Sequence, residues 1–79
     1  MNNIDKLFLS FSEALAISVD SISLDLEYQS IPEWDSVSHM VLIAQLEDDF
    51  NVSFDTDDVI DLSSVAKGKE ILSKLGVEF

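Results

Sequence analysis

The pattern that most limits the fold lies in the middle of the chain, between residues 36 and 50. Apolar residues recur there at spacings of three and four, the period of an α-helix with a buried face. They are Val37, Met40, Ile43, Leu46 and Phe50, with Val41, Leu42 and Ala44 widening the apolar arc. Asp35, which precedes the pattern, is a residue type that caps helix N-termini. We therefore predict a helix over residues 36–50 with Asp35 as its N-cap.

This apolar arc is wider than one core face needs, and two interpretations follow. Either the helix is central and buried on two sides, or one flank with Val37, Val41 and Ala44 stays at the surface. Exposed apolar residues beside acidic ones are typical of a docking face. Acidic residues 47–49 follow at the C-terminal end, where the helix dipole disfavours negative charge. Helix stabilisation alone is therefore a poor explanation for these acids.

Three more helices are predicted from apolar spacing and from capping residues. They cover residues 3–18, a short stretch at 55–62, and a last segment from residue 63 or 64 to about 75. Phe8 and Phe11 are expected in the core, and Gly76 is a typical C-terminal stop. Residues 19–35 are rich in turn formers and are predicted to be an ordered loop pinned by isolated apolar side chains. The predicted fold is all-α, a small four-helix bundle of three longer helices and a short third one, with a long ordered loop between the first two.

Length and composition exclude several classes of protein. The 79 residues suffice for a single domain spanning 1–79, and the absence of cysteine excludes disulfides and thiolate metal sites. No apolar run approaches the roughly 20 residues that span a bilayer, and the N-terminal residues lack the pattern of a signal peptide. We therefore expect a cytoplasmic protein without membrane insertion, and a monomer.

The charge balance indicates the kind of partner. Sixteen acidic residues face four lysines, for a formal charge of −12. Nucleic acid and anionic membranes would be repelled, whereas a partner with a basic patch would be attracted. The acids can also be explained by solubility alone, but a hydrophobic content of 47% is too high for a disordered acidic tail. The lysines at 67, 69 and 74 are expected to face outward.

Asp35, Ser36 and His39 are the residue types of a serine hydrolase triad, but their arrangement does not fit one. In a triad the acid orients the far nitrogen of the imidazole, whereas here it is the serine's own neighbour. No glycine-rich turn supplies an oxyanion hole. We therefore predict no catalytic residue and no enzymatic activity, and we interpret His39 as an exposed residue of the helix surface.

Residues 55–58 resemble the start of a calcium loop. Continuing that register places Ile60 where the loop needs glycine and Ala66 where it needs a bidentate glutamate. A single histidine and no cysteine give no support for zinc. No specific metal site is predicted, although clustered acids are expected to bind divalent cations loosely.

Ser36 remains, a hydroxyl at the first turn of a predicted helix. Backbone N–H groups and the helix dipole favour an anion there, so a phosphate ester on Ser36 would be stabilised. A serine that receives a group must be exposed and must lie on a surface that the modifying enzyme recognises. It needs no catalytic base of its own, because the modifying enzyme supplies one. We therefore interpret Ser36 as an attachment point.

With Asp35-Ser36-Val37 opening the second helix, and Leu46-Glu47-Asp48-Asp49-Phe50 ending it, the chain resembles the acyl carrier proteins over nearly its whole length. In that family an Asp-Ser-Leu motif carries 4′-phosphopantetheine on its serine, and Val37 is a conservative departure from leucine. Residues 31–36 resemble freestanding carriers more than peptidyl carriers. Trp34 departs from the small residue that often precedes the aspartate, and Val41 stands where many fatty-acid carriers have an acid.

The resemblance implies an acyl or aminoacyl carrier whose cargo is a thioester on an arm attached to Ser36. A phosphopantetheinyl transferase would attach the arm, using coenzyme A and magnesium. Acyl-activating enzymes, acyltransferases and synthases with basic patches are the other implied partners. The predicted partner-recognition residues are Asp35, Val37, Val41, Glu47 and Asp48.

Partner specificity is predicted at Trp34 and Val37, which flank the motif. The departures favour a specialised carrier for a secondary or surface-polymer pathway. A short acyl cargo is expected near the apolar residues Met40, Ile43, Leu46 and Ile60. The alternative function is an acidic protein–protein interaction module without a prosthetic group.

Overall fold

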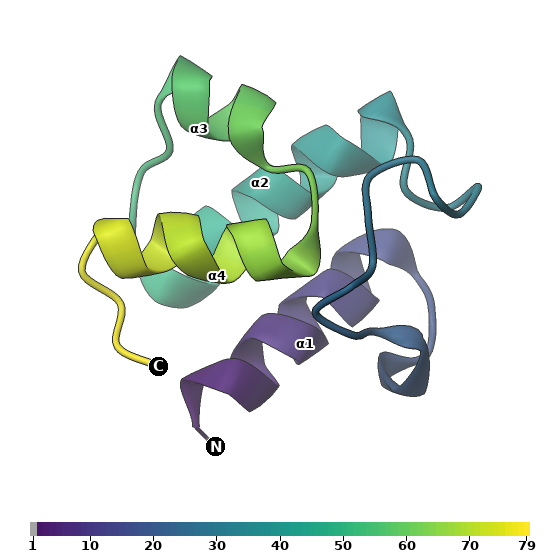
Figure 1. The fold of residues 1–79 in the computed structure, drawn as a ribbon, viewed down its shortest axis with the longest axis horizontal. Helices are drawn as coiled ribbons and strands as arrows, with labels where there is room; N and C mark the ends of the chain where they lie inside the picture. The colour runs from purple at the N-terminus through teal and green to yellow at the C-terminus, as the bar shows by residue number, and fades with distance from the viewer. Residues whose placement is uncertain (1) are drawn as a thin grey trace.

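The computed structural model describes residues 2–79, and within them the chain forms four α-helices. They are α1 (Asn3–Leu15), α2 (Ser36–Phe50), α3 (Thr56–Asp61) and α4 (Val65–Lys74), with a 3₁₀ turn, η1 (Val19–Ser21), after α1. In Figure 1, α4 crosses in front of α2, α3 lies at the upper end, and the start of α1 lies close to the C-terminal end of the chain. The predicted all-α bundle with a short third helix is confirmed. Within residues 2–79, no helix is long and apolar enough to cross a membrane.

The predicted bounds of α2 and its cap are confirmed. The Asp35 carboxylate accepts hydrogen bonds from the backbone N–H groups of Val37, at 3.1 Å, and Ser38, at 2.9 Å. At the other end Asn51 adopts a left-handed conformation with φ of 54°, and its N–H bonds to the carbonyl of Glu47. Both ends therefore follow from local chemistry, an N-cap and a left-handed C-cap.

The other helices are shorter than predicted. Helix α1 ends at Leu15, three residues before the expected end, because Ala16 turns to the left-handed region with φ of 56°. Helices α3 and α4 begin one residue after their caps, Asp55 and Ser64, whose side chains accept from the backbone N–H groups of the first turn. The predicted boundaries had counted the cap residues as helix.

Trp34 lies at the centre of the core, with no exposed surface. Its ring meets that of Phe11 edge to face, with centroids 5.4 Å apart. The predicted role of Trp34 in partner specificity is therefore wrong, because its side chain is inaccessible to a partner. Phe11 is fully buried as predicted, whereas Phe8 packs only partly buried against the edge of the core.

The long loop between α1 and α2 is ordered, as predicted. Three backbone hydrogen bonds tie it to the start of α4: Tyr28 N–H to Ser63, Val65 N–H to Leu26 and Ala66 N–H to Leu24, each of 2.9 to 3.0 Å. The apolar residues that pin the loop to the core are Ile22, Leu26, Tyr28 and Ile31. These contacts hold the loop in place, and thereby fix the position at which α2 begins.

Candidate functional site

Ser36 is the first residue of α2 and is exposed to solvent. The residues on either side of it are held by a capping box, in which Asp35 caps the helix and the Ser38 hydroxyl accepts from the backbone N–H of Asp35 at 2.9 Å. The Ser38 hydroxyl lies 2.6 Å from the carbonyl oxygen of Glu33 and 3.1 Å from the Asp35 carboxylate, and it shares its one proton between these two acceptors. This network fixes the backbone under Ser36 and leaves its own hydroxyl at the surface.

Asp35 stays ionised over a wide pH range. Hydrogen bonds from the backbone N–H and the hydroxyl of Ser38 lower the pKa of Asp35 below its usual value, and the N–H of Val37 adds to the effect. The same contacts occupy N–H groups that the sequence suggested for a phosphate on Ser36. A phosphate ester there would therefore sit beside an ionised carboxylate.

One flank of α2 is exposed and apolar, which decides between the two interpretations of its wide arc. The exposed fractions are 73% for Val37, 57% for Met40 and 51% for Val41, and Ala44 is also exposed. We call Val37, Met40, Val41 and Ala44 the α2 apolar surface. On α3, Ile60 is exposed by 74%. An apolar surface of this kind, starting at the residue after Ser36, suits contact with another protein.

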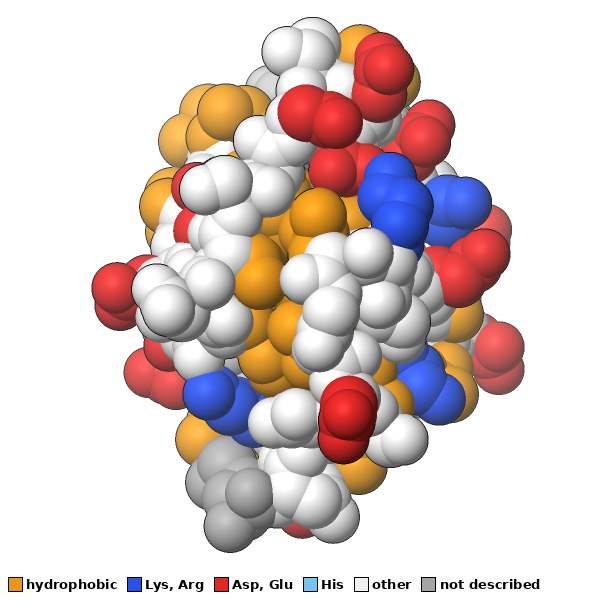
Figure 2. All heavy atoms as spheres, turned by 90° about the vertical axis from the view of Figure 1, so that its left-hand side faces the viewer, with side chains coloured by type: hydrophobic (Ala, Val, Ile, Leu, Met, Phe, Trp, Pro, Cys, Tyr) orange, Lys and Arg blue, Asp and Glu red, His pale blue; other side chains and the backbone are white. Residues whose placement is uncertain are grey.

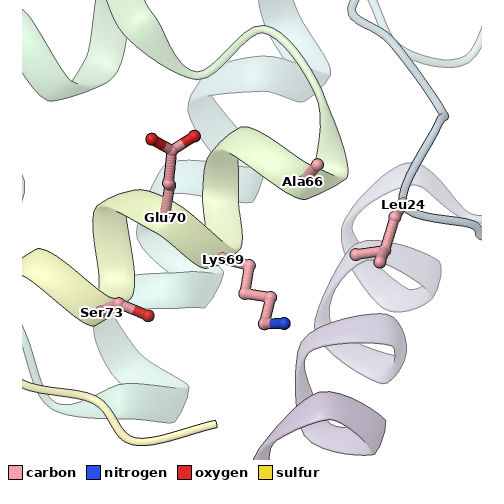
Figure 3. Close-up of a pocket in the computed structure, with 5 residues that line it drawn as sticks. All are labelled: Leu24, Ala66, Lys69, Glu70 and Ser73. Atoms are coloured by element: carbon pink, nitrogen blue, oxygen red, sulfur yellow. The ribbon is translucent and has the colours of Figure 1, made fainter.

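The expected cargo site is not formed by the residues predicted for it. Met40 and Ile60 face solvent, whereas Ile43 and Leu46 are buried in the core. A hollow of about 330 Å³ lies elsewhere, between α4 and the long loop. Its lining residues are Leu24, Ala66, Lys69, Glu70 and Ser73. In Figure 3, Leu24 faces the hollow from the loop and Lys69 extends into it from α4, whereas Glu70 points away.

His39 is buried, with an exposed fraction of 9%, so its predicted exposure is wrong. Its Nδ1 accepts from the indole N–H of Trp34 at 3.0 Å, and its Nε2 lies 3.0 Å from the carbonyl oxygen of Val59. Because both ring nitrogens have partners, the imidazole is unavailable as a base for Ser36. The geometry therefore agrees with the argument against a hydrolase triad.

The three acids at the end of α2 have different roles. Glu47 accepts a hydrogen bond from the backbone N–H of Phe54 at 2.8 Å, and so holds the connector after α2. Asp49 accepts from Ser10 of α1 and Gln45, whereas Asp48 is exposed. Two of the acids thus contribute to the fold, whereas Asp48 remains exposed to solvent.

Asp58 is a buried acid that the sequence did not reveal. Its residue is 1% exposed, and its carboxylate lies 2.6 Å from Nζ of Lys74. The hydrogen bond from Lys74 is the main cause that lowers the pKa of Asp58, and the same bond raises the pKa of Lys74. The Lys74 side chain faces outward as predicted, with 63% of it exposed, and its ammonium group also ties α4 to α3. In Figure 2, acidic side chains gather at the upper end of the molecule, where Figure 1 places α3, with lysine side chains beside them.

Most of the chain matches a known protein family. Residues 5–67 match the family described as the phosphopantetheine attachment site, and that range covers the loop, α2 and α3. The chain belongs to this family. No curated protein and no solved structure matches it.

Members of this family carry 4′-phosphopantetheine covalently on a serine, so the cofactor and the family predicted from resemblance are confirmed. The protein is a phosphopantetheine-carrying carrier protein. Ser36 lies inside the matched range and fits such a group, because its hydroxyl is exposed and the backbone beneath it is held by Asp35 and Ser38. Among residues 2–79, the fold brings together no group of three or more acidic or histidine side chains able to hold a metal ion.

Proposed function

We propose that the protein carries an acyl or aminoacyl group as a thioester on a phosphopantetheine arm attached to Ser36, and presents it to partner enzymes. The observation that carries this proposal is the exposed hydroxyl at the first position of α2, directly after the Asp35 cap. The thiol of the arm also explains how a chain without cysteine takes part in thioester chemistry.

In the attachment step, Ser36 Oγ is the nucleophile and the carrier supplies no base. The new bond joins Oγ to the phosphorus that bears pantetheine in coenzyme A. The pyrophosphate bond of coenzyme A breaks, and its nucleotide part leaves. The transferase, with its magnesium, must accept the hydroxyl proton, because the nitrogens of His39 are engaged by Trp34 and Val59. The carrier's contribution is to hold the hydroxyl at a rigid, accessible position.

The partners we propose are a phosphopantetheinyl transferase and then acyl-activating enzymes, acyltransferases or synthases. Their docking site would include the α2 apolar surface, with Val37 next to Ser36 and Val41 about one turn further along the helix. Asp48 would attract basic residues on the partner, since the carrier has a formal charge of −12. Asp35 and Glu47 would act mainly through the local structure they hold, the N-terminal cap and the connector.

Residues 1–79 would act as one domain, because the described helices share a single core. We place the protein in the cytoplasm, as a monomer. The departure at Val41, which is exposed, favours a specialised pathway.

The test is incubation with coenzyme A, magnesium and several broad-specificity transferases, followed by intact-mass measurement. Wild type is expected to gain the mass of one phosphopantetheine, and Ser36→Ala is expected to gain none. Ser53→Ala, at an exposed serine after α2, is the matched control and should be modified like wild type. An unmodified wild type would overturn the proposal in favour of an acidic interaction module. A Ser36→Ala variant that is still modified would overturn the assignment of Ser36 as the attachment site.

A further inference from the structure

His39 has both ring nitrogens engaged, and its neighbours determine which nitrogen carries the proton. The Nε1 of Trp34 lies 3.0 Å from Nδ1 of His39. An indole N–H can only donate, so Nδ1 must be unprotonated and must accept this hydrogen bond. The proton of the neutral ring therefore lies on Nε2, which donates to the carbonyl oxygen of Val59 at 3.0 Å.

The ring is also held by packing. The centroid of the Tyr28 ring lies 4.9 Å from that of His39, and the Trp34 ring is nearly parallel to it, with an interplanar angle of 19°. Trp34 and Tyr28 belong to the long loop, His39 to α2 and Val59 to α3. The imidazole therefore joins three segments at one point.

Helix α3 depends on such attachments for its place. It has six residues, and a helix of that length is not stable by itself. The carbonyl of Val59 is among its last four, which have no partner within a helix. His39 supplies that partner from the α2 side, and Lys74 bonds to Asp58 from the α4 side.

We propose that His39 is a positioning residue that fixes α3 beside the arm-bearing end of α2. The proposal rests on Ser36 being the attachment site, because His39 lies one helical turn after Ser36. With Nε2–H bonded to Val59, α3 holds the exposed Ile60 in a constant position relative to the α2 apolar surface. A partner enzyme then meets the two helices already arranged, which lowers the ordering cost of docking.

The tautomer can be observed directly, because the chain has one histidine and one tryptophan. In ¹⁵N-labelled protein at neutral pH, the nitrogen resonances should show an unprotonated Nδ1 and a protonated Nε2. The indole N–H of Trp34 should exchange slowly with solvent. A protonated Nδ1, or an exchanging mixture of tautomers, would overturn the proposal.

Variants test the effect on α3 and on docking. His39→Leu removes both hydrogen bonds, whereas His39→Gln keeps one acceptor and one donor. Ser10→Ala is the control for general destabilisation, because it removes the partly buried hydrogen bond that the buried Ser10 of α1 donates to Asp49 of α2. Relative to that control, His39→Leu should speed amide exchange in α3 about five- to tenfold, the effect of one lost hydrogen bond. It should also raise the transferase KM for the carrier with kcat unchanged, and His39→Gln should restore most of both.

The proposal is overturned if α3 exchange and KM in His39→Leu match those in Ser10→Ala, or if His39→Gln restores neither. If His39→Leu fails to fold, His39→Gln decides: exchange in α3 within about twofold of wild type supports the proposal, and exchange as fast as global unfolding overturns it. If the wild-type protein accepts no phosphopantetheine, the proposed carrier function is refuted. The tautomer and the α3 exchange rates would still show whether His39 positions α3.

Discussion

Replacing Phe11 with leucine tests the centre of the core without removing it. Phe11 is fully buried, its ring meets Trp34 edge to face at 5.4 Å, and Gly68 of α4 packs close to the same ring. Losing an edge-to-face aromatic pair costs about 0.5 to 1.5 kcal/mol, and the shape change adds up to about 1.5 kcal/mol. We expect Phe11→Leu to lower the free energy of unfolding by about 1 to 2 kcal/mol, a combined estimate within these ranges.

That loss is large for a domain of 79 residues, whose total stability is of the order of 4 to 12 kcal/mol. Urea titration monitored by Trp34 fluorescence measures it, because Trp34 is the chain's single tryptophan and is fully buried. With an m-value of about 1 kcal/mol/M, expected for a small domain, the urea midpoint should fall by about 1 to 2 M.

Phe8→Leu is the matched control, since Phe8 lies on the same helix and is only partly buried at the edge of the core. It should cost less than half as much as Phe11→Leu. Equal midpoints for the two variants would refute the assignment of Phe11 to the centre of the core. Folded Phe11→Leu should still be modified at Ser36, because the two residues lie on different helices.

Three further predictions concern charge. Because its pKa is lowered, Asp58 contributes stability that is fully present above its usual pKa of 3.8 and lost as pH falls through the lowered value. Lys74, whose pKa is raised, contributes stability that is present below 10.5 and lost at higher pH. In wild type, the urea midpoint should fall both at low pH and at high pH. In Lys74→Met, both decreases in the midpoint should be smaller. With a net charge of −12, the melting temperature should rise with sodium chloride, and more with millimolar magnesium; a value indifferent to salt would contradict self-repulsion. Glu47→Ala should cost about 1 kcal/mol in urea titrations, whereas Asp48→Asn should change stability by less than about 0.5 kcal/mol and weaken binding to a basic partner enzyme. A larger loss of stability in Asp48→Asn than in Glu47→Ala would contradict the roles assigned to these two acids.

Much of the candidate site could be predicted from the sequence, because it depends on interactions within one or two helical turns. The spacing of apolar residues and the Asp35 cap predicted both ends of α2, and an N-cap acts on backbone groups two and three residues away. The same local argument placed Ser36 at the start of the helix. The starts of α3 and α4 were also predicted to within one or two residues.

The residues that were predicted wrongly or were missed are those whose environment comes from distant parts of the chain. His39 bonds to Val59, 20 residues away, and Asp58 to Lys74, 16 residues away. Trp34, next to a polar motif in the sequence, is buried because Phe11 and Tyr28 enclose it once the helices pack.

The sequence alone therefore determined that the protein is a small, acidic, helical domain with a serine at a helix start, because hydrophobic period, capping and charge are properties of short segments; the carrier function was implied by the family resemblance of the Asp35-Ser36-Val37 motif. Only the tertiary structure decided which flank of α2 stays exposed and which polar residues hold α3, because burial and hydrogen bonding depend on which helices meet.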